Sequence, residues 1–393
     1  MSQLLNERWS ETKDALLEGL SGTRKSSMSV CLENTRRYLA ESATTGATSS
    51  GNIATLNRVI LPVIRRVMPT VIANEIIGVQ PMTGPVGQIH TLRVRYADTS
   101  SGDSVVAGDE ALSPFKIAAA YSGNNVDGTP KANTTAVLEG QPGKRMSIQI
   151  LKAPVEAKSR KLSARWTFEA AQDAQAMQGI DIEAEIMAAL AQEITAEIDQ
   201  EILQSLRTLA SVEQTYDQSL VSGTATFVGD EHAALAIQIN RVANLIAQRT
   251  RRGAANWAVV SNQALTILQS ATTSAFARTT EGTFEAPTNT KFVGTLNGAM
   301  RIYVDAYKTD SDDNNQVLVG YKGTSEADAA AFYCPYIPLM SSGVVLDPAT
   351  FEPVVGFLTR YGYVELNNTA SSLGNAADYL GKVAITSATV SFK

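Results

Sequence analysis

The sequence predicts an α+β protein, and three observations lead to that fold class. Residues 182–206 carry an apolar side chain at every fourth position, which is typical of an amphipathic helix. Residues 86–97 and 146–157 alternate in the manner of β-strands. Beyond residue 230, helical and strand-like segments follow one another, as in α+β architectures. A chain of 393 residues, 44% of them hydrophobic, is long enough for two or three compact units.

The N-terminal 41 residues are expected to form two amphipathic helices, separate from the rest of the chain. The apolar face of the first would hold Leu4, Leu5, Trp9, Leu16, Leu17 and Leu20, and that of the second Met28, Cys31, Leu32, Thr35 and Leu39. Residues 42–51 are small and polar, which indicates a linker. We expect a further helix over residues 57–77, interrupted near Pro62 and Pro69.

The alternating segments at 86–97 and 146–157 are predicted to pair as one long ribbon. Their shared faces comprise His90, Leu92, Val94 and Tyr96 on the first strand, and Met146, Ile148 and Ile150 on the second. About fifty residues rich in small and polar side chains separate the two strands. Strands of this length reach on the order of 40 Å. Because a lone two-stranded ribbon is marginally stable, we expect it to lie across a neighbouring molecule.

The long helix at 182–206 is expected to be a structural spine with one buried ridge. That ridge consists of Ile182, Ile186, Leu190, Ile194, Ile198, Ile202 and Leu206. Between Trp166 and Leu206 there are nine acidic residues and no lysine or arginine. The acids therefore have no cation on their own helix.

Glu193, Glu197 and Glu201 lie four residues apart and run along the edge of the ridge. Like charges at this spacing repel one another, so cations from elsewhere are expected to meet them. We consider three sources: the four bases of residues 158–165, the pair Arg65 and Arg66, or a neighbouring subunit. A solvated acidic face is the alternative. We mark Arg65, Arg66 and the three glutamates as candidate assembly residues.

The C-terminal half is expected to continue with helices and strands in turn. Asp230 is a candidate cap for a helix that ends near Arg249 and buries Leu235, Ile239, Val242 and Ile246. Residues 257–260 are expected to form a short buried strand, followed by a helix that Ser261 caps. Further strands are predicted at 301–307, 316–321, 330–337, 354–366 and 383–392, with an acidic turn at 310–315.

The sequence offers few groups for chemistry, and we predict no catalytic, cofactor or metal site. The two histidines, His90 and His232, stand without a metal-ligand cluster, and no phosphate-binding or nucleophile-elbow motif is present. The SxxK match at residues 10–13 and the Tyr-Lys-Gly at 321–323 are interpreted as a chance match and a strand end. An enzyme is therefore not expected.

Composition restricts the partners and the compartment. A net charge of −6 gives no reason to expect nucleic-acid binding, and the low charged fraction of 18% suggests a surface covered by other copies. Cys31 and Cys334 are expected to be reduced thiols in a cytosol. The polar N-terminus does not look like a signal peptide, and no apolar run is long enough to cross a membrane.

Several segments, taken together, resemble the major capsid protein of T-even-type tailed phages. They are Val67–Thr70, Ile77–Met82, Gly84–Gln88, Glu156–Leu162, Glu169–Asp173, Gly179–Asp181, Val319–Gly323, Tyr333–Leu339 and Val355–Gly362. The matches are collinear and cover most of residues 43–393. The resemblance implies the HK97-type capsid fold and a protein that self-assembles through hexamers, and in some phages pentamers, into an icosahedral shell around double-stranded DNA.

The resemblance also assigns the segments already described. It implies an N-terminal arm at 1–66 with a removable section at 1–41, an E-loop at 86–157, a P-domain at 67–85, 158–222 and 350–393, and an A-domain at 223–349. Scaffold, vertex and cement proteins would be further partners, the DNA would be enclosed without sequence-specific binding, and the protein would be found in the virion after assembly in the host cytoplasm.

The chain departs from the family pattern in one respect and matches a processing signal in another. Only a loop separates the two ribbon strands, so the large inserted domain of the T-even type is missing or reduced. The family's maturation protease cuts after glutamate in a Leu/Ile-x-Glu context, which Leu39-Ala-Glu41 matches. The bond between Glu41 and Ser42 is therefore the candidate cleavage point, and an uncut chain is the alternative. No lysine can be assigned to crosslinking between subunits.

Two other functions remain as alternatives. An encapsulin-like shell would share the fold but enclose protein cargo, and the removable section and the T-even-like motifs argue against it. A soluble enzyme of unrelated fold would form only a small oligomer with a polar pocket.

Overall fold

A computed structural model describes the greater part of this chain. The described residues are 9, 13, 14, 17, 22, 25–34, 71–99, 105–109, 111, 121–123, 132, 135–139, 143–178, 181–217, 228–250, 252–270, 276–278, 291–305, 316–324, 328–347, 349, 350, 352–366 and 376–387. They divide between two compact units. The first comprises Met1–Gly87, Pro154–Gln204 and Phe332–Val364, and the second comprises Gln88–Ala153, Ser205–Ala331 and Glu365–Lys393.

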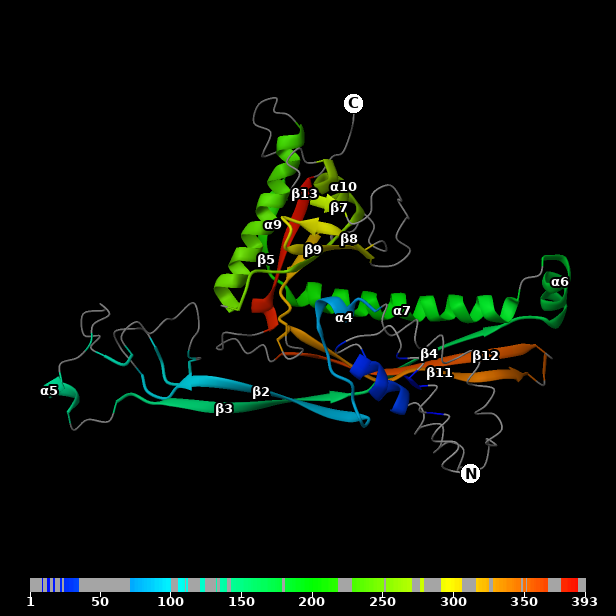
Figure 1. Cartoon of the computed structure of the whole chain (residues 1–393), viewed down its shortest axis with the longest axis horizontal. Helices are drawn as coiled ribbons and strands as arrows, with labels where there is room; N and C mark the ends of the chain where they lie inside the picture. The colour runs from blue at the N-terminus through cyan, green and yellow to red at the C-terminus, as the bar shows by residue number, and fades with distance from the viewer. Residues whose placement is uncertain are drawn as a thin grey trace. The chain divides into compact units, whose positions relative to one another are not determined.

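The first unit is built on a four-stranded sheet in the order β1-β11-β12-β4, of which Figure 1 labels β11, β12 and β4. Its strands are β1 (Gly78–Val79), β11 (Ala331–Leu346), β12 (Pro353–Glu365) and β4 (Lys158–Arg165). Strands β12 and β4 pair antiparallel from Val354–Arg165 to Tyr361–Lys158. Alternate residues of β12 are buried, so one face of this sheet belongs to the core.

Helix α7 (Ile182–Leu209) is the predicted long helix, and Figure 1 shows it as one uninterrupted element. The buried part of its ridge comprises Leu190, Ile194, Ile198, Ile202 and Leu206, whereas Ile182 and Ile186 are half-buried. The prediction of a single apolar ridge is therefore confirmed. A separate helix, α6 (Phe168–Gln178), precedes it.

The predicted ribbon is confirmed as a two-stranded sheet of β2 (Val86–Tyr96) and β3 (Met146–Glu156) (Figure 1). Its residues up to Gly87 and from Pro154 onward belong to the first unit, and Gln88–Ala153 belong to the second. Toward the tip, the rings of Tyr96 and Tyr121 pack with centroids 4.5 Å apart and planes tilted by 50°, within a small cluster that also buries Val105 and Ala111. A four-residue helix, α5 (Thr135–Leu138), is also described in the segment between the strands.

The second unit contains a seven-stranded sheet in the order β5-β13-β10-β6-β9-β8-β7. These strands are β5 (Val212–Asp217), β13 (Leu380–Ser387), β10 (Gln316–Gly320), β6 (Trp257–Val260), β9 (Met300–Val304), β8 (Lys291–Leu296) and β7 (Phe276–Arg278). Helices α9 (Val228–Thr250) and α10 (Asn262–Ser270) share one core with it. Helices and strands thus mix throughout, which confirms the α+β class.

The predictions for the two helices of the second unit are mostly confirmed. Helix α9 buries all four of its predicted core residues, Leu235, Ile239, Val242 and Ile246. Asp230 is not its cap, because the helix already includes Val228 and Asp230 lies inside the first turn. The predicted cap of α10 is correct, since the Ala264 N–H donates to Ser261 Oγ at 3.2 Å.

Several strands lie outside the sequence expectation. Strands β4, β5, β7 and β8 were not predicted, and β11 extends nine residues beyond Ile337 to Leu346. Strand pairing divides the chain between sheets across the implied domain boundaries, which remain a prediction. Strand β11, which lies within the implied A-domain, pairs with β12, and β13, which lies within the implied P-domain, belongs to the seven-stranded sheet. Backbone hydrogen bonding between strands distant in sequence decides this division.

Other expectations fall partly or wholly outside the described residues. They are most of the two N-terminal helices, the linker at 42–51, the helix at 57–70, the acidic turn at 310–315, and the residues Glu41, Ser42, Arg65 and Arg66. Within the described part, α4 (Ala73–Ile76) falls in the expected segment 57–77. None of the described helices is both long and apolar enough to cross a membrane.

Candidate assembly surfaces

The acidic edge of α7 meets a cation from β4. Arg160 Nη1 donates to Glu197 Oε2 at 2.7 Å, and Arg160 Nη2 donates to Glu201 Oε2 at 2.5 Å. Arg160 Nε also donates to the Tyr361 hydroxyl at 2.6 Å, and that hydroxyl donates to Glu201. Of the three cation sources considered, the first therefore supplies a partner within the chain.

The alternation of β4 explains why Arg160 can make these contacts. Arg160, Leu162 and Ala164 are half-buried, whereas Lys161 and Ser163 between them are exposed. Arg160 therefore points toward the α7 side of the sheet. The Arg160 guanidinium, planar and always charged, can serve two carboxylates and a hydroxyl at once.

Protonation of this cluster follows from its contacts. Burial opposes the charge of Glu201, but the Tyr361 hydroxyl and the Arg160 guanidinium together hold the pKa of Glu201 below its usual value. Burial and the neighbouring Glu201 carboxylate raise the pKa of Tyr361. The cluster is therefore an ion pair with a neutral tyrosine at neutral pH.

Glu193 stands apart from this cluster, because it is exposed on α7. An intersubunit role for Glu193, Glu197 and Glu201 remains a prediction. Since Glu197 and Glu201 already accept from Arg160, Glu193 is the member whose change would disturb the chain itself least.

The N-terminal section is partly docked on the first unit. Residues 25–34 are helical, and Met28, Cys31 and Leu32 are fully buried. The Asn34 side chain donates to the Met82 carbonyl at 2.7 Å and to the Tyr336 carbonyl at 3.0 Å. This differs from the expectation of a separate N-terminal section, because one amide satisfies two backbone acceptors far away in sequence.

Both cysteines are buried free thiols, as expected. Burial raises the pKa of Cys31 to about 12 and that of Cys334 to about 12. Such thiols are almost entirely protonated at neutral pH and are poor nucleophiles.

The described residues offer little for catalysis. His232 is buried and hydrogen-bonded to the Ser270 hydroxyl, and His90 is exposed on the ribbon. Among the described residues, no three histidine, cysteine, aspartate or glutamate side chains gather as metal ligands. The Lys322 N–H donates to Asn256 Oδ1 at 3.0 Å and the Gly323 N–H to the Asp328 carbonyl at 2.8 Å, so this segment ends a strand.

One buried ion pair was missed by the sequence analysis. Arg207 Nη2 donates to Asp305 Oδ2 at 2.8 Å in the second unit, with both side chains almost fully buried. The available signal was that Arg207 is the first base after a span of acids. Because a buried charge needs a partner, this pair fixes the end of α7 against the end of β9.

The ribbon presents an apolar row to solvent. Met146, Ile148 and Ile150 are 54%, 68% and 61% exposed, and they share one face of β3. Exposed apolar rows of this kind mark surfaces for protein contacts.

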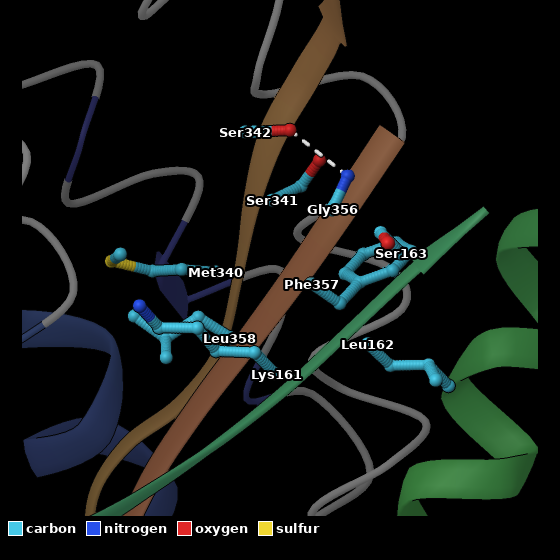
Figure 2. A pocket seen from close by; sticks show the side chains of 9 residues that line it. All are labelled: Lys161, Leu162, Ser163, Met340, Ser341, Ser342, Gly356, Phe357 and Leu358. Atoms are coloured by element: carbon cyan, nitrogen blue, oxygen red, sulfur yellow. Dashed lines mark hydrogen bonds between the residues drawn. The ribbon is translucent and has the colours of Figure 1, made fainter. Parts of the chain in front are cut away.

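A cavity of about 430 Å³ opens on the four-stranded sheet of the first unit. Its walls come from three strands, with Lys161, Leu162 and Ser163 from β4, Met340, Ser341 and Ser342 from β11, and Gly356, Phe357 and Leu358 from β12 (Figure 2). The Gly356 N–H donates to Ser342 Oγ at 2.9 Å across two of these strands. No local pattern of residues could have revealed this cavity, because it exists only once the strands are paired.

Comparison with known proteins places these surfaces in context. A sequence model of the family described as "Major capsid protein Gp23" matches residues 53–385. The major capsid protein of Vibrio phage KVP40 is 29% identical over an alignment 434 positions long, gaps included, which covers 86% of this chain and 82% of the phage protein. The corresponding protein of Enterobacteria phage T4 is 29% identical over 429 residues, with 86% and 80% covered.

A third relative is also a phage major capsid protein, and two solved structures come from phages. The major capsid protein of Serratia phage KSP90 is 30% identical over 347 residues, with 80% of this chain and 78% of that protein covered. A chain of Mycobacterium phage Bobi has a TM-score of 0.45 at 12% identity, with 81% and 91% covered. A chain from the capsid of Myoviridae Phage XM1 has a TM-score of 0.40 at 12% identity, with 79% and 90% covered. Both TM-scores are below 0.5, so the relationship rests on the sequence matches.

Proposed function

The chain belongs to the family of the major capsid protein Gp23, and from that premise we propose that it builds the head shell of a tailed phage by assembling with copies of itself. The observation that carries the proposal is the family match over residues 53–385. An encapsulin-like shell with protein cargo, the other shell considered, has no comparable support.

The surfaces of the chain support self-assembly. The ribbon is long, two-stranded and lined on one side by exposed Met146, Ile148 and Ile150. Such a ribbon gains stability when its apolar row is covered, and other copies supply the cover in a shell. Many interfaces of ordinary size, about 1,000–2,000 Å² each, would then add up to a stable particle.

We further propose the HK97-type capsid fold with the N-terminal arm, E-loop, P-domain and A-domain named above. The ribbon β2–β3 corresponds to the E-loop, and α7 corresponds to the long helix of the P-domain. Copies would form hexamers, with pentamers where a shell must close by symmetry. Scaffold, vertex and cement proteins are the expected further partners.

The shell would enclose double-stranded DNA without reading its sequence, and the protein would reside in the virion. The net charge of −6 supports a container that does not grip its contents. The absence of an enzymatic role is part of the same proposal, because its support comes from the family and not from a test of activity.

Electron microscopy of the purified full-length chain, with and without its phage partners, tests the proposal. Closed icosahedral shells or hexameric sheets are expected. Small soluble oligomers under all conditions, including with scaffold present, would contradict it. The contents of the particles then distinguish a phage head, which holds genomic DNA, from a compartment that holds protein.

Cleavage between Glu41 and Ser42 is a separate proposal. It is supported by the Leu-Ala-Glu sequence at 39–41 directly before a small, polar segment. An intact-mass spectrum of mature particles should show a chain that begins at Ser42. A spectrum with only the full-length chain would contradict it.

A further inference from the structure

We propose that helix α6 of one copy docks into the cavity on the four-stranded sheet of a second copy, with Met177 as the apolar anchor and Asp173 facing Lys161. This inference rests on the proposed self-assembly and names one of its contacts. Two surfaces of the first unit support it, an exposed short helix and an open apolar recess.

Helix α6 is short and almost entirely exposed. It is 11 residues long, and every side chain that the structure describes on it is exposed except the half-buried Ala171. Isolated helices shorter than about 12–15 residues are marginal in water. Phe168 and Met177 are 48% and 86% exposed, which is unusual for side chains of this kind. A partner that covers α6 would stabilise the helix and bury Phe168 and Met177.

One face of α6 combines two acidic side chains with one apolar side chain. Glu169, Asp173 and Met177 lie four residues apart, so they share a face, with two carboxylates followed by the exposed thioether. The helix contains no base, so nothing on it neutralises these charges. The three side chains span about 12 Å along the helix axis.

The cavity offers the complementary pattern. Met340 and Leu358 provide apolar wall, and Lys161 stands exposed at its rim (Figure 2). Arg165 lies two alternations further along the same face of β4, on the order of 13 Å from Lys161. A cavity of about 430 Å³ is within the size range that accommodates a side chain or small ligand. Lys161 is therefore the cation that lines the recess, whereas Arg165 lies beyond it and pairs with Glu352 at 3.7 Å.

An α6 helix that fills the cavity must come from another copy, because the chain's own α6 does not reach it. Only Trp166 and Thr167 join β4 to α6, and the Trp166 N–H donates to the Pro353 carbonyl at 3.2 Å, which fixes the end of the strand. In this structure α6 stays exposed while the cavity is open. A head-to-tail contact of α6 with a second cavity generates a ring when the rotation between copies closes, and a ring is what a capsomer requires.

A cysteine crosslink tests the contact directly. Met177→Cys is introduced in one preparation and Ser163→Cys, at the rim of the cavity, in another. The two are mixed, assembled and oxidised. The native Cys31 and Cys334 are buried, so they contribute little background. A disulfide-linked dimer is expected only when both variants are present. As a matched control, Ile237→Cys, 67% exposed but on α9, should give no dimer with Ser163→Cys.

Normal particles without the Met177–Ser163 dimer would overturn the inference while leaving the proposed function intact. Protection of Ser163→Cys from thiol reagents in such particles would show that a different occupant fills the cavity, which also overturns it. If wild-type chain fails to assemble at all, the proposed function fails instead.

Charge exchange supplies a second readout. Lys161→Glu should reduce the assembled fraction several-fold, because it sets like charges opposite each other. Combining it with Asp173→Lys in the same chain should restore most of the loss. Unfolding curves of the unassembled variants should match the wild type, since both residues are exposed. A double variant that assembles no better than Lys161→Glu would contradict the pairing.

Discussion

Glu201 keeps its charge in a partly buried position because two groups donate to it. The Tyr361 hydroxyl donates a hydrogen bond to the Glu201 carboxylate, and the Arg160 guanidinium donates another at 2.5 Å. These contacts hold the pKa of Glu201 in the folded protein below the value of 4.5 that the free side chain has. The unfolded chain therefore binds a proton at this site at a higher pH than the folded chain does.

The consequence is a pH dependence of stability. The contribution of Glu201 is complete above the unfolded pKa and is lost as the pH falls through the lower, folded pKa. We expect Glu201→Gln to cost about 1 kcal/mol at neutral pH, after allowance for screening at this half-exposed side chain. The difference in urea unfolding between variant and wild type should begin to shrink as the pH falls below about 4.5 and should vanish below the folded pKa. A difference that is constant with pH would contradict this, and exposed Glu193→Gln serves as the control.

Gly320 is needed because Trp257 occupies the space where its side chain would lie. The two residues are paired neighbours on β10 and β6, and a Cβ at Gly320 would lie 2.1 Å from Trp257 Cζ2. We expect Gly320→Ala to cost roughly 1–3 kcal/mol or more, because the buried indole cannot move away without disturbing the sheet. Thermal unfolding measures the loss. Gly143→Ala, with open space around it, should be close to neutral.

At the scale of elements, strong periodicity decided what could be predicted. Helices α7 and α9 each repeat an apolar residue over several turns, and the structure buries most of those residues. The ribbon strands alternate over eleven residues each and were also foreseen. In these segments the repeated side chains are apolar, so the pattern is visible in the sequence.

Strands β4, β5 and β7, which were not predicted, lack such a repeated pattern of apolar side chains. In β4, Arg160 occupies one of the positions that face the core, so the strand shows no apolar alternation. The ion-pair partner of Arg160 is Glu201, which is distant in sequence. Strand β7 has only three residues, and β5 pairs with β13 through register shifts. The pairing of β5 with a strand distant in sequence is not encoded locally, and β7, which pairs with the next strand β8, is too short to show a pattern.

The helical segment 25–34 depends on Asn34 for its attachment. Loss of the Asn34 amide would leave the Met82 and Tyr336 carbonyls without this donor. We expect Asn34→Ala to loosen the segment, so that Cys31 reacts several-fold faster with a thiol reagent in the unassembled chain. Cys31 is now fully buried, with a pKa raised to about 12. Lys25→Ala, exposed on the same helix, is the control, and equal rates in both variants would contradict the role of Asn34.

At the scale of the whole molecule, the sequence predicted which bases meet the acidic edge of α7, but it did not predict the cavity on the four-stranded sheet. Arg160 belongs to the group of bases that was expected to meet Glu197 and Glu201. The cavity could not be foreseen, because its walls come from three strands, one of them far from the other two in sequence. Arg65, Arg66, Glu41 and Ser42 lie outside the described residues, so their roles stay predictions.

The exposed row of the ribbon separates folding from assembly. Ile148 is 68% exposed in the single chain, so its replacement removes almost no intramolecular contact. We expect Ile148→Lys to change the free energy of unfolding by no more than about 0.5 kcal/mol. In a shell the same position would be covered, and a buried lysine without a partner is costly.

Ile148→Lys should therefore lower the yield of closed particles strongly while the unassembled chain keeps its unfolding curve. Gln149→Lys is the matched control, because Gln149 is also exposed but lies on the opposite face of β3. Sedimentation measures the assembled fraction, and electron microscopy shows whether the particles are closed. Equal yields from both variants would mean that the apolar row stays in solvent after assembly, and the ribbon would then contact its neighbours through its other face.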